Sequence, residues 1–178
     1  FLRKAVTAGA THAVIEMTSE GARQFRHKGI ELDALVFTNL SPEHIEAHGG
    51  FEKYKQAKIS LFSYLEKLPD KVLDGVNILK SIVVNLDDKN SGDFVKFKVD
   101  KTFGWTCNSN QNMVSVDEEV KATDISYNLN GTRAKVNGHN LESQLIGPFY
   151  FNNTLAAITV LTALGFSLDQ ILPKVKTL

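Results

Sequence analysis

The most constraining feature of this sequence is a series of short apolar runs that alternate with segments of helical periodicity. Residues 12–15, 34–37 and 81–84 are such runs, and polar residues follow each of them at once. Residues 51–65, between the second and third runs, repeat apolar side chains at helical spacing. Short buried strands that alternate with helices are typical of a parallel sheet, so the sequence predicts an α/β fold flanked by helices.

Beyond residue 93 the pattern changes to short alternating segments separated by turns. Residues 94–99 and 125–129 alternate apolar and polar side chains, which predicts strands of an antiparallel β meander appended to the parallel sheet. The turn signals between such segments are the pairs Asn130-Gly131 and Asn137-Gly138.

These patterns divide the chain without breaking it into separate domains. We expect one α/β core formed by residues 1–93 and 146–178, with residues 94–145 as an antiparallel subdomain. No internal repeat or low-complexity linker interrupts the 178 residues.

Further helices are predicted from their start and stop signals. Residues 1–9 read as a helix that ends at Gly9, and residues 152–164 as an apolar helix. Ser41-Pro42 is typical of a helix start, and Ser167 is expected to cap the last helix.

Composition excludes several classes of protein. The 20 basic and 20 acidic residues cancel, whereas binders of nucleic acid or of anionic membranes need a basic excess. No apolar stretch approaches the roughly 20 residues that span a bilayer. The single cysteine, Cys107, excludes an intrachain disulfide and fits a cytoplasmic protein. We therefore expect no nucleic-acid partner and no membrane partner.

Polar side chains follow each predicted parallel strand. Because ligands of open parallel sheets bind at the carboxyl ends of the strands, we expect these side chains to share one edge. A carboxylate and an imidazole at such an edge suit a divalent cation. In chain order the residues are Glu16, Thr18, Ser19, Thr38, Asn39, Glu43, His44, His48, Asn85, Asp87 and Asp88.

Each of these residues also has a simpler interpretation. Glu16 can be a solvated loop acid, and His44 and His48 can be a chance pair on one face of a surface helix. Asp87 and Asp88 can serve a turn, because aspartate favours turns.

Lys58 lies on the apolar face of the predicted helix, between Tyr54 and Leu61. One interpretation is that its stem packs while the ammonium group reaches water. The other is a partly buried lysine that can act as a neutral amine.

Two features indicate that the chain is part of something longer. It starts at Phe1 without an initiator Met and reads from there as the interior of a helix. It contains no GxxxxGK[ST] loop, and so has no obvious means of cradling a triphosphate by itself. We therefore expect the isolated chain to be inactive and to self-associate through an exposed sheet edge.

Five blocks, in the same order, resemble motifs of the Mur ligases, and most closely those of the branch that adds the third residue of the peptidoglycan stem. The resemblance covers nearly the whole chain. The blocks are residues 13–21 (AVIEMTSEG), 37–49 (FTNLSPEHIEAHG), 54–58 (YKQAK), 85–88 (NLDD) and 147–157 (GPFYFNNTLAA).

The resemblance implies the central ATP-binding domain of a three-domain ligase. ATP would phosphorylate the carboxylate of a UDP-MurNAc-peptide, and an amino acid would attack the acyl phosphate. By the same resemblance Glu16 and His44 would hold Mg²⁺, with Lys58 as an N-carboxylated residue that also serves a magnesium ion.

The resemblance also assigns binding residues. Asn153 would approach the adenine of ATP, and Asn39 the phosphates. Thr18, Ser19 and His48 would line the site of the nucleotide-peptide.

Some positions depart from the family pattern. Pro42-Glu43 stands where Arg-Asp is usual, and Tyr150 stands for an Asn. These departures keep two alternatives open. One is an amide ligase of the folylpolyglutamate or cyanophycin type, and the other is a non-catalytic scaffold that retains the fold.

Overall fold

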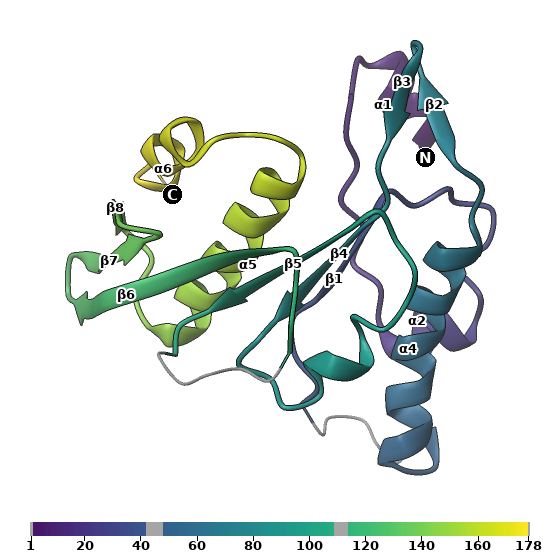
Figure 1. The fold of residues 1–178 in the computed structure, drawn as a ribbon, viewed down its shortest axis with the longest axis horizontal. Coiled ribbons are helices and arrows are strands. Elements are labelled where there is room, and N and C mark those ends of the chain that lie inside the picture. Colours follow the sequence, from purple (N-terminus) through teal and green to yellow (C-terminus); the bar gives the residue numbers. More distant parts are fainter. Residues whose placement is uncertain (1, 42–47, 109–113, 178) are drawn as a thin grey trace.

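A computed structural model describes residues 2–41, 48–108 and 114–177. Its centre is a six-stranded sheet in the order β1-β4-β5-β6-β7-β8, beside a separate two-stranded hairpin (Figure 1). The strands of the large sheet are β1 (Ala34–Phe37), β4 (Ser81–Asn85), β5 (Lys101–Thr106), β6 (Glu118–Asn128), β7 (Gly131–Val136) and β8 (His139–Ser143), and those of the hairpin are β2 (Lys71–Leu73) and β3 (Val76–Ile78).

The first four strands of the large sheet are parallel, as the alternation of apolar runs and helices predicts. β1 pairs with β4, β4 with β5, and β5 with the first residues of β6. From Ala122 onward β6 pairs antiparallel with β7, with a register shift between Thr123 and Ser126. The parallel sheet and the antiparallel meander are thus joined through one long strand, which confirms the mixed α/β fold.

Tight turns hold the meander together. Asn137 and Gly138 both have positive φ, as a two-residue hairpin turn requires. Gly131 opens β7, and a side chain there would collide with the backbone carbonyl of Ser143. Glycine is therefore required at this position by space as well as by its φ of 129°.

The helices are α1 (Leu2–Thr7), α2 (Ser19–Arg23), α4 (Phe51–Lys67), α5 (Pro148–Ala163) and α6 (Leu168–Val175), with a short 3-10 turn, η1 (Ser91–Asp93). α4 confirms the predicted helix over residues 51–65. α5 begins earlier than expected, because Pro148 after Gly147 supplies a helix start. Ser167 caps α6 as predicted. Within the described ranges, no helix is long and apolar enough to cross a membrane.

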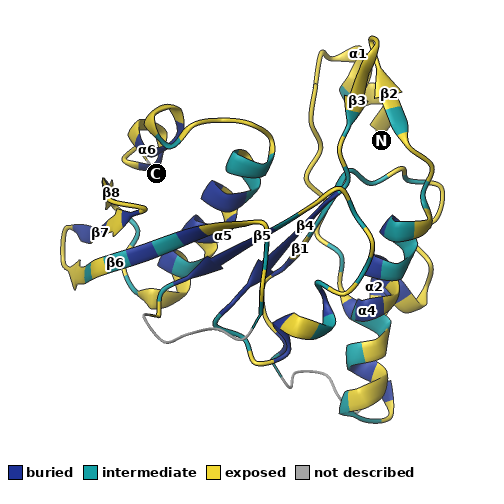
Figure 2. Cartoon of the chain, in the orientation of Figure 1, coloured by how far each residue is buried: buried dark blue, intermediate teal, exposed yellow. Residues whose placement is uncertain are grey.

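The sheet separates two apolar cores. β4 is buried along its whole length and alternates between them: Val83 belongs to the core under α5 and α6, whereas Ile82 and Val84 face α4 (Figure 2). A strand buried on both faces explains why residues 81–84 read as a continuous apolar run.

Two predicted strands are wrong. Residues 12–15 have no regular structure, and Val14 is 99% exposed. An apolar run becomes a strand only when a neighbouring strand pairs with its backbone, and none of the described strands does so here. The short helix expected after Ser41-Pro42 falls mostly on residues 42–47, outside the described residues.

Residues 94–99, also expected as a strand, continue irregularly after η1. Their apolar side chains pack into the core under α4 instead. The Phe94 ring stacks on the Phe37 ring, with 3.8 Å between ring centres. It also packs edge-to-face with the Phe62 ring, with 5.0 Å between ring centres. The alternating pattern therefore serves side-chain packing and not strand pairing.

Candidate functional site

The carboxyl ends of β1, β4 and β5 meet at one edge of the sheet, here called the rim. Asn85, the last residue of β4, donates from Nδ2 to the Thr38 carbonyl oxygen just after β1, at 2.9 Å. Its Oδ1 accepts the backbone N–H of Asp87 at 3.0 Å. One buried side chain thus joins the neighbouring strand end to the loop that follows its own strand.

Asp87 and Asp88 extend these connections in opposite directions. Asp88 Oδ2 accepts the backbone N–H of Leu40, beyond β1, at 2.9 Å. Asp87 Oδ1 accepts Thr106 Oγ1 at 2.5 Å, and its Oδ2 accepts the backbone N–H of Cys107 at 2.8 Å, at the end of β5. Both acids are therefore committed to holding the rim together. Burial, together with the Asp87 charge, raises the pKa of the Cys107 thiol to about 11.

Residues 10–18, which lead into α2, form no helix or strand. Glu16 is exposed and makes no ion pair with another described residue. Thr18 caps α2 by accepting the backbone N–H of Gly21 at 3.0 Å. Ser19 is buried, and its Oγ lies 3.0 Å from His48 Nε2.

Two of the four lysines of α4 have contrasting surroundings. Lys58 is half-buried, with Nζ 5.4 Å from the centre of the Tyr54 ring one turn earlier. Lys55 pairs with Asp93 and lies 3.4 Å from Asn90 Oδ1. The hydrogen bond from Lys55 holds the pKa of the Asp93 carboxyl below its usual value.

The side chains of the remaining predicted residues take no part in the hydrogen bonds described above. Asn39 is exposed, and its Oδ1 accepts the Ser41 hydroxyl at 3.2 Å. Asn153 is exposed on α5. His44 lies outside the described residues. The structure thus brings Ser19 and His48 into direct contact, and no described contact joins either of them to Asn39 or Asn153.

One contact was not anticipated from the sequence. Trp105 is fully buried at the end of β5, and its Nε1 donates to Asn152 Oδ1 at 2.7 Å. This bond joins the rim to α5 next to Asn153. The signal available in the sequence was Asn152 itself, a polar residue next to the predicted Asn153 on a largely apolar helix.

The described ranges, residues 2–41, 48–108 and 114–177, contain several possible metal-binding side chains. Within them, no three His, Cys, Asp or Glu side chains are grouped closely enough to hold a metal ion. The two rim aspartates accept hydrogen bonds from backbone and side-chain donors, which leaves Glu16 as the exposed acid among the described candidates.

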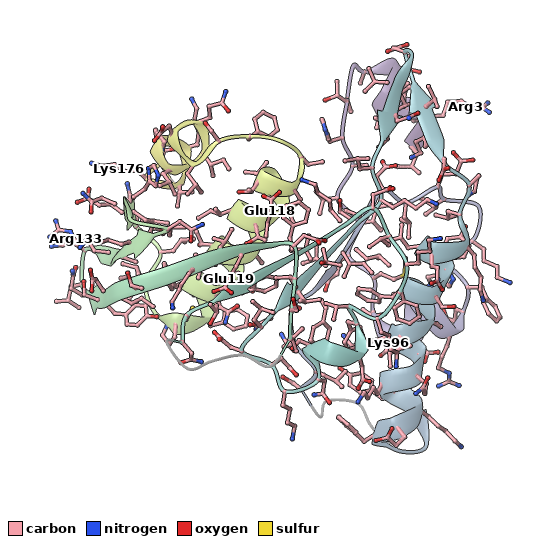
Figure 3. The ribbon with its side chains drawn as sticks, in the orientation of Figure 1. Arg3, Lys96, Glu118, Glu119, Arg133 and Lys176 are labelled. Carbon is pink, nitrogen blue, oxygen red and sulfur yellow. The ribbon has the colours of Figure 1, made fainter. Side chains whose placement is uncertain are left out.

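A hollow surface lies elsewhere, at the antiparallel end. A cavity of about 760 Å³ opens between β8 and α6, with a second of about 460 Å³ beside it. Figure 3 shows Arg133 and Lys176 pointing outward at this end. None of the predicted site residues that the structure describes lines the first cavity. Its lining includes the titratable residues Arg133, His139, Glu142, Asp169 and Lys176.

Comparison with known proteins gives a consistent result. A family model described as the Mur ligase middle domain matches residues 1–161. A UDP-N-acetylmuramoyl-L-alanyl-D-glutamate--2,6-diaminopimelate ligase of Prochlorococcus marinus is 32% identical over 177 residues, which is 96% of this chain and 33% of that protein. The corresponding L-lysine ligase of Staphylococcus aureus is 29% identical, over 99% of this chain and 34% of its own length.

Solved structures agree. A 2,6-diaminopimelate ligase of this kind superposes with a TM-score of 0.77 at 28% identity, over 99% of this chain and 34% of that one. A pseudomurein peptide ligase type C from Methanothermus fervidus shares the fold alone, with a TM-score of 0.61 at 17% identity over 91% of this chain and 37% of that one. The chain spans about a third of the length of these proteins. Because the family model covers most of its residues, the chain belongs to the Mur ligase family, whose middle domain it matches.

Proposed function

We propose that the natural protein carrying this chain is an ATP-dependent ligase that joins an amino acid to a UDP-N-acetylmuramoyl-peptide in peptidoglycan synthesis, in the cytoplasm. The observation that carries the proposal is the rim, where the loops after three adjacent parallel strands are held together by Asn85, Asp87 and Asp88. Open parallel sheets bind their ligands at such an edge. Relatives named for both diaminopimelate and L-lysine leave the amino acid open.

The reaction needs activation of a carboxylate. A carboxylate oxygen of the peptide attacks the γ-phosphorus of ATP, ADP leaves, and an acyl phosphate forms. The amine of the amino acid then attacks the carbonyl carbon, phosphate leaves with the bonding electrons, and the amine loses a proton. The protein contributes by aligning the reactants and stabilising the charge that develops on the phosphoryl oxygens.

Glu16, His44 and Lys58 form the proposed magnesium site. The exposed Glu16 carboxylate is a donor of the kind that Mg²⁺ prefers. Lys58 would supply oxygen donors once its neutral amine had added CO₂, forming a carbamate with release of a proton. Bound Mg²⁺ would neutralise charge on the transferred phosphoryl group.

The proposed binding residues come from several elements. We assign Asn39 and Asn153 to ATP, with Asn153 on the exposed side of α5. Thr18 faces the nucleotide-peptide, and the buried Ser19 and His48, which contact each other, border that part of the site.

The test is substrate-dependent release of ADP by the natural full-length protein. We expect release that requires Mg²⁺, a UDP-N-acetylmuramoyl-L-alanyl-D-glutamate acceptor and one amino acid, with lysine and diaminopimelate assayed separately. Release that requires a folate or a cyanophycin-type acceptor instead would assign the protein to another ligase class. A failure to release ADP with any of these acceptors would favour the non-catalytic scaffold.

The isolated 178-residue chain is proposed to be inactive and self-associating. It contains no GxxxxGK[ST] loop, and β1 lies at the edge of the described sheet with Val36 exposed. Sedimentation should show a concentration-dependent rise in mass, because open strand edges recruit other chains. A constant monomer mass at high concentration would contradict this.

A further inference from the structure

Ser19 and His48 form a buried contact between two segments that are far apart in sequence. The two residues are 29 positions apart, each is 7% exposed, and 3.0 Å separates Ser19 Oγ from His48 Nε2. A hydrogen bond shielded from water is stronger electrostatically than one at the surface. The contact therefore fixes the start of α2 against the residue that precedes Gly49 and Gly50 at the start of α4.

The His48 ring continues this connection into α4. It meets the Tyr54 ring edge-on, with 5.4 Å between ring centres, and Tyr54 is itself buried. Lys58 Nζ lies 5.4 Å from the centre of the same Tyr54 ring. Ser19, His48, Tyr54 and Lys58 thus form an unbroken chain of contacts.

Glu16 lies three residues before Ser19, next to the end of this series of contacts that is opposite Lys58. Residues 10–18 have no helix or strand of their own, so the nearest anchor decides where the Glu16 carboxylate lies. That anchor is well packed, because Ser19, Gly21 and Ala22 of α2 are all buried. The position of Glu16 therefore depends on how the start of α2 is held.

The surroundings of His48 favour holding over direct contact with a ligand. Its Nε2 is engaged by Ser19, while its Nδ1 is buried and has no hydrogen-bond partner among the described residues. The described contacts of His48, the Ser19 hydroxyl at Nε2 and the Tyr54 ring, are both with the protein, so they hold segments of the chain together.

We propose that Ser19 and His48 are positioning residues that set Glu16 relative to Lys58 through the Tyr54 ring. The role rests on the proposed function, because it concerns the proposed magnesium site. Ser19 and His48 then act through other residues and do not recognise the nucleotide-peptide themselves.

The experiment compares Ser19→Ala, His48→Phe and the double variant in the natural full-length protein. His48→Phe keeps a ring against Tyr54 and removes the bond to Ser19. We expect kcat to fall about 10- to 100-fold, the Mg²⁺ concentration for half-maximal rate to rise, and KM for the UDP-peptide to stay within about twofold. The double variant should be no worse than the more severe single variant, because both remove the same bond.

Matched controls and a conservative variant separate positioning from general damage. Ser60→Ala and His139→Phe make the same chemical changes at exposed sites and should leave the kinetic constants unchanged. His48→Gln retains a nitrogen donor and should recover part of the lost kcat. Should His48→Phe fail to fold, Ser19→Ala, which removes one oxygen atom, carries the test.

A readout independent of catalysis completes the design. Hydrogen exchange of residues 21–26, whose amides are hydrogen-bonded in and after α2, should accelerate in Ser19→Ala and His48→Phe, while α5 is unchanged. Unchanged exchange would overturn the inference even in an active ligase, as would a raised KM for the UDP-peptide with unchanged kcat. A wild-type protein without ligase activity would refute the proposed function, whereas hydrogen exchange would still decide whether the pair holds the Glu16 segment.

Discussion

The two ends of the large sheet use their acidic residues differently. At the rim, Asp87 and Asp88 accept backbone N–H groups from the ends of neighbouring strands. At the antiparallel end, Glu142 pairs with Arg133 at 3.3 Å and with Lys176 at 2.9 Å, and all three side chains are exposed. The cavities lie at the second end, whereas the motif block of residues 85–88 lies at the first.

Under the proposed function, the hollow surface of this molecule does not mark the site. Exposed ion pairs contribute about 0–1 kcal/mol each and are screened by salt, so they fix geometry weakly. Half-buried carboxylates that accept backbone hydrogen bonds hold strand ends in place. Chemistry that depends on alignment is therefore expected at the rim.

The largest effect is expected in the core beneath the rim. Trp105→Ala should lower the free energy of unfolding by about 3–5 kcal/mol, because it leaves a cavity and an unpaired Asn152. Leu129→Ala, at a 94% exposed position of the antiparallel end, should change it by less than about 0.5 kcal/mol. Urea unfolding measures both, and equal losses would break the comparison.

Substitutions at the two ends of the sheet should also differ strongly in their effect on ligase activity. In the full-length protein, Glu16→Ala should lower kcat by at least about 100-fold, because it removes a proposed metal ligand. Glu142→Ala should leave ADP release within about twofold of wild type. A large loss in the second variant would move the site to the antiparallel end.

The reactivity of Cys107 reports on the rim acids. Because its pKa is raised from 9.0 to about 11, the thiolate fraction near pH 8 should be about 100-fold below that of an ordinary thiol, with slow alkylation. Asp87→Asn removes a negative charge and should speed alkylation, whereas Asp169→Asn should not. The raised pKa contributes stability below about pH 9 that is lost as the pH rises to about 11.

The smallest effect concerns the pair between Lys55 and Asp93 beside the rim. The pKa of Asp93 is lowered by Lys55, so the pair adds stability above the ordinary value of 3.8, and this stability is lost as the pH falls through the lowered value. Because the Asp93 side chain is 37% exposed, Asp93→Asn should cost only about 0.2–1 kcal/mol at neutral pH. Thermal unfolding at neutral and acidic pH should show the difference shrinking in acid.

Local patterns were sufficient wherever a segment carries its own signal. The apolar run at residues 81–84 predicted β4, helical spacing predicted α4, and Ser167 predicted the cap of α6. They failed for residues 12–15, because no described strand pairs with that apolar run, and Val14 is left exposed. They failed for residues 94–99, because alternation describes which side chains are buried and not which backbone pairs with them.

The candidate site divides in the same way. The sequence alone identified the residues at the strand ends and the motifs that resemble the Mur ligases, because motif spacing is local. Only the tertiary structure decided that Asp87 and Asp88 bind protein donors, and that Ser19 and His48 contact each other across 29 residues. Such contacts depend on how the chain is brought together in space, and a buried polar group must be paired with whatever donor or acceptor the fold places beside it.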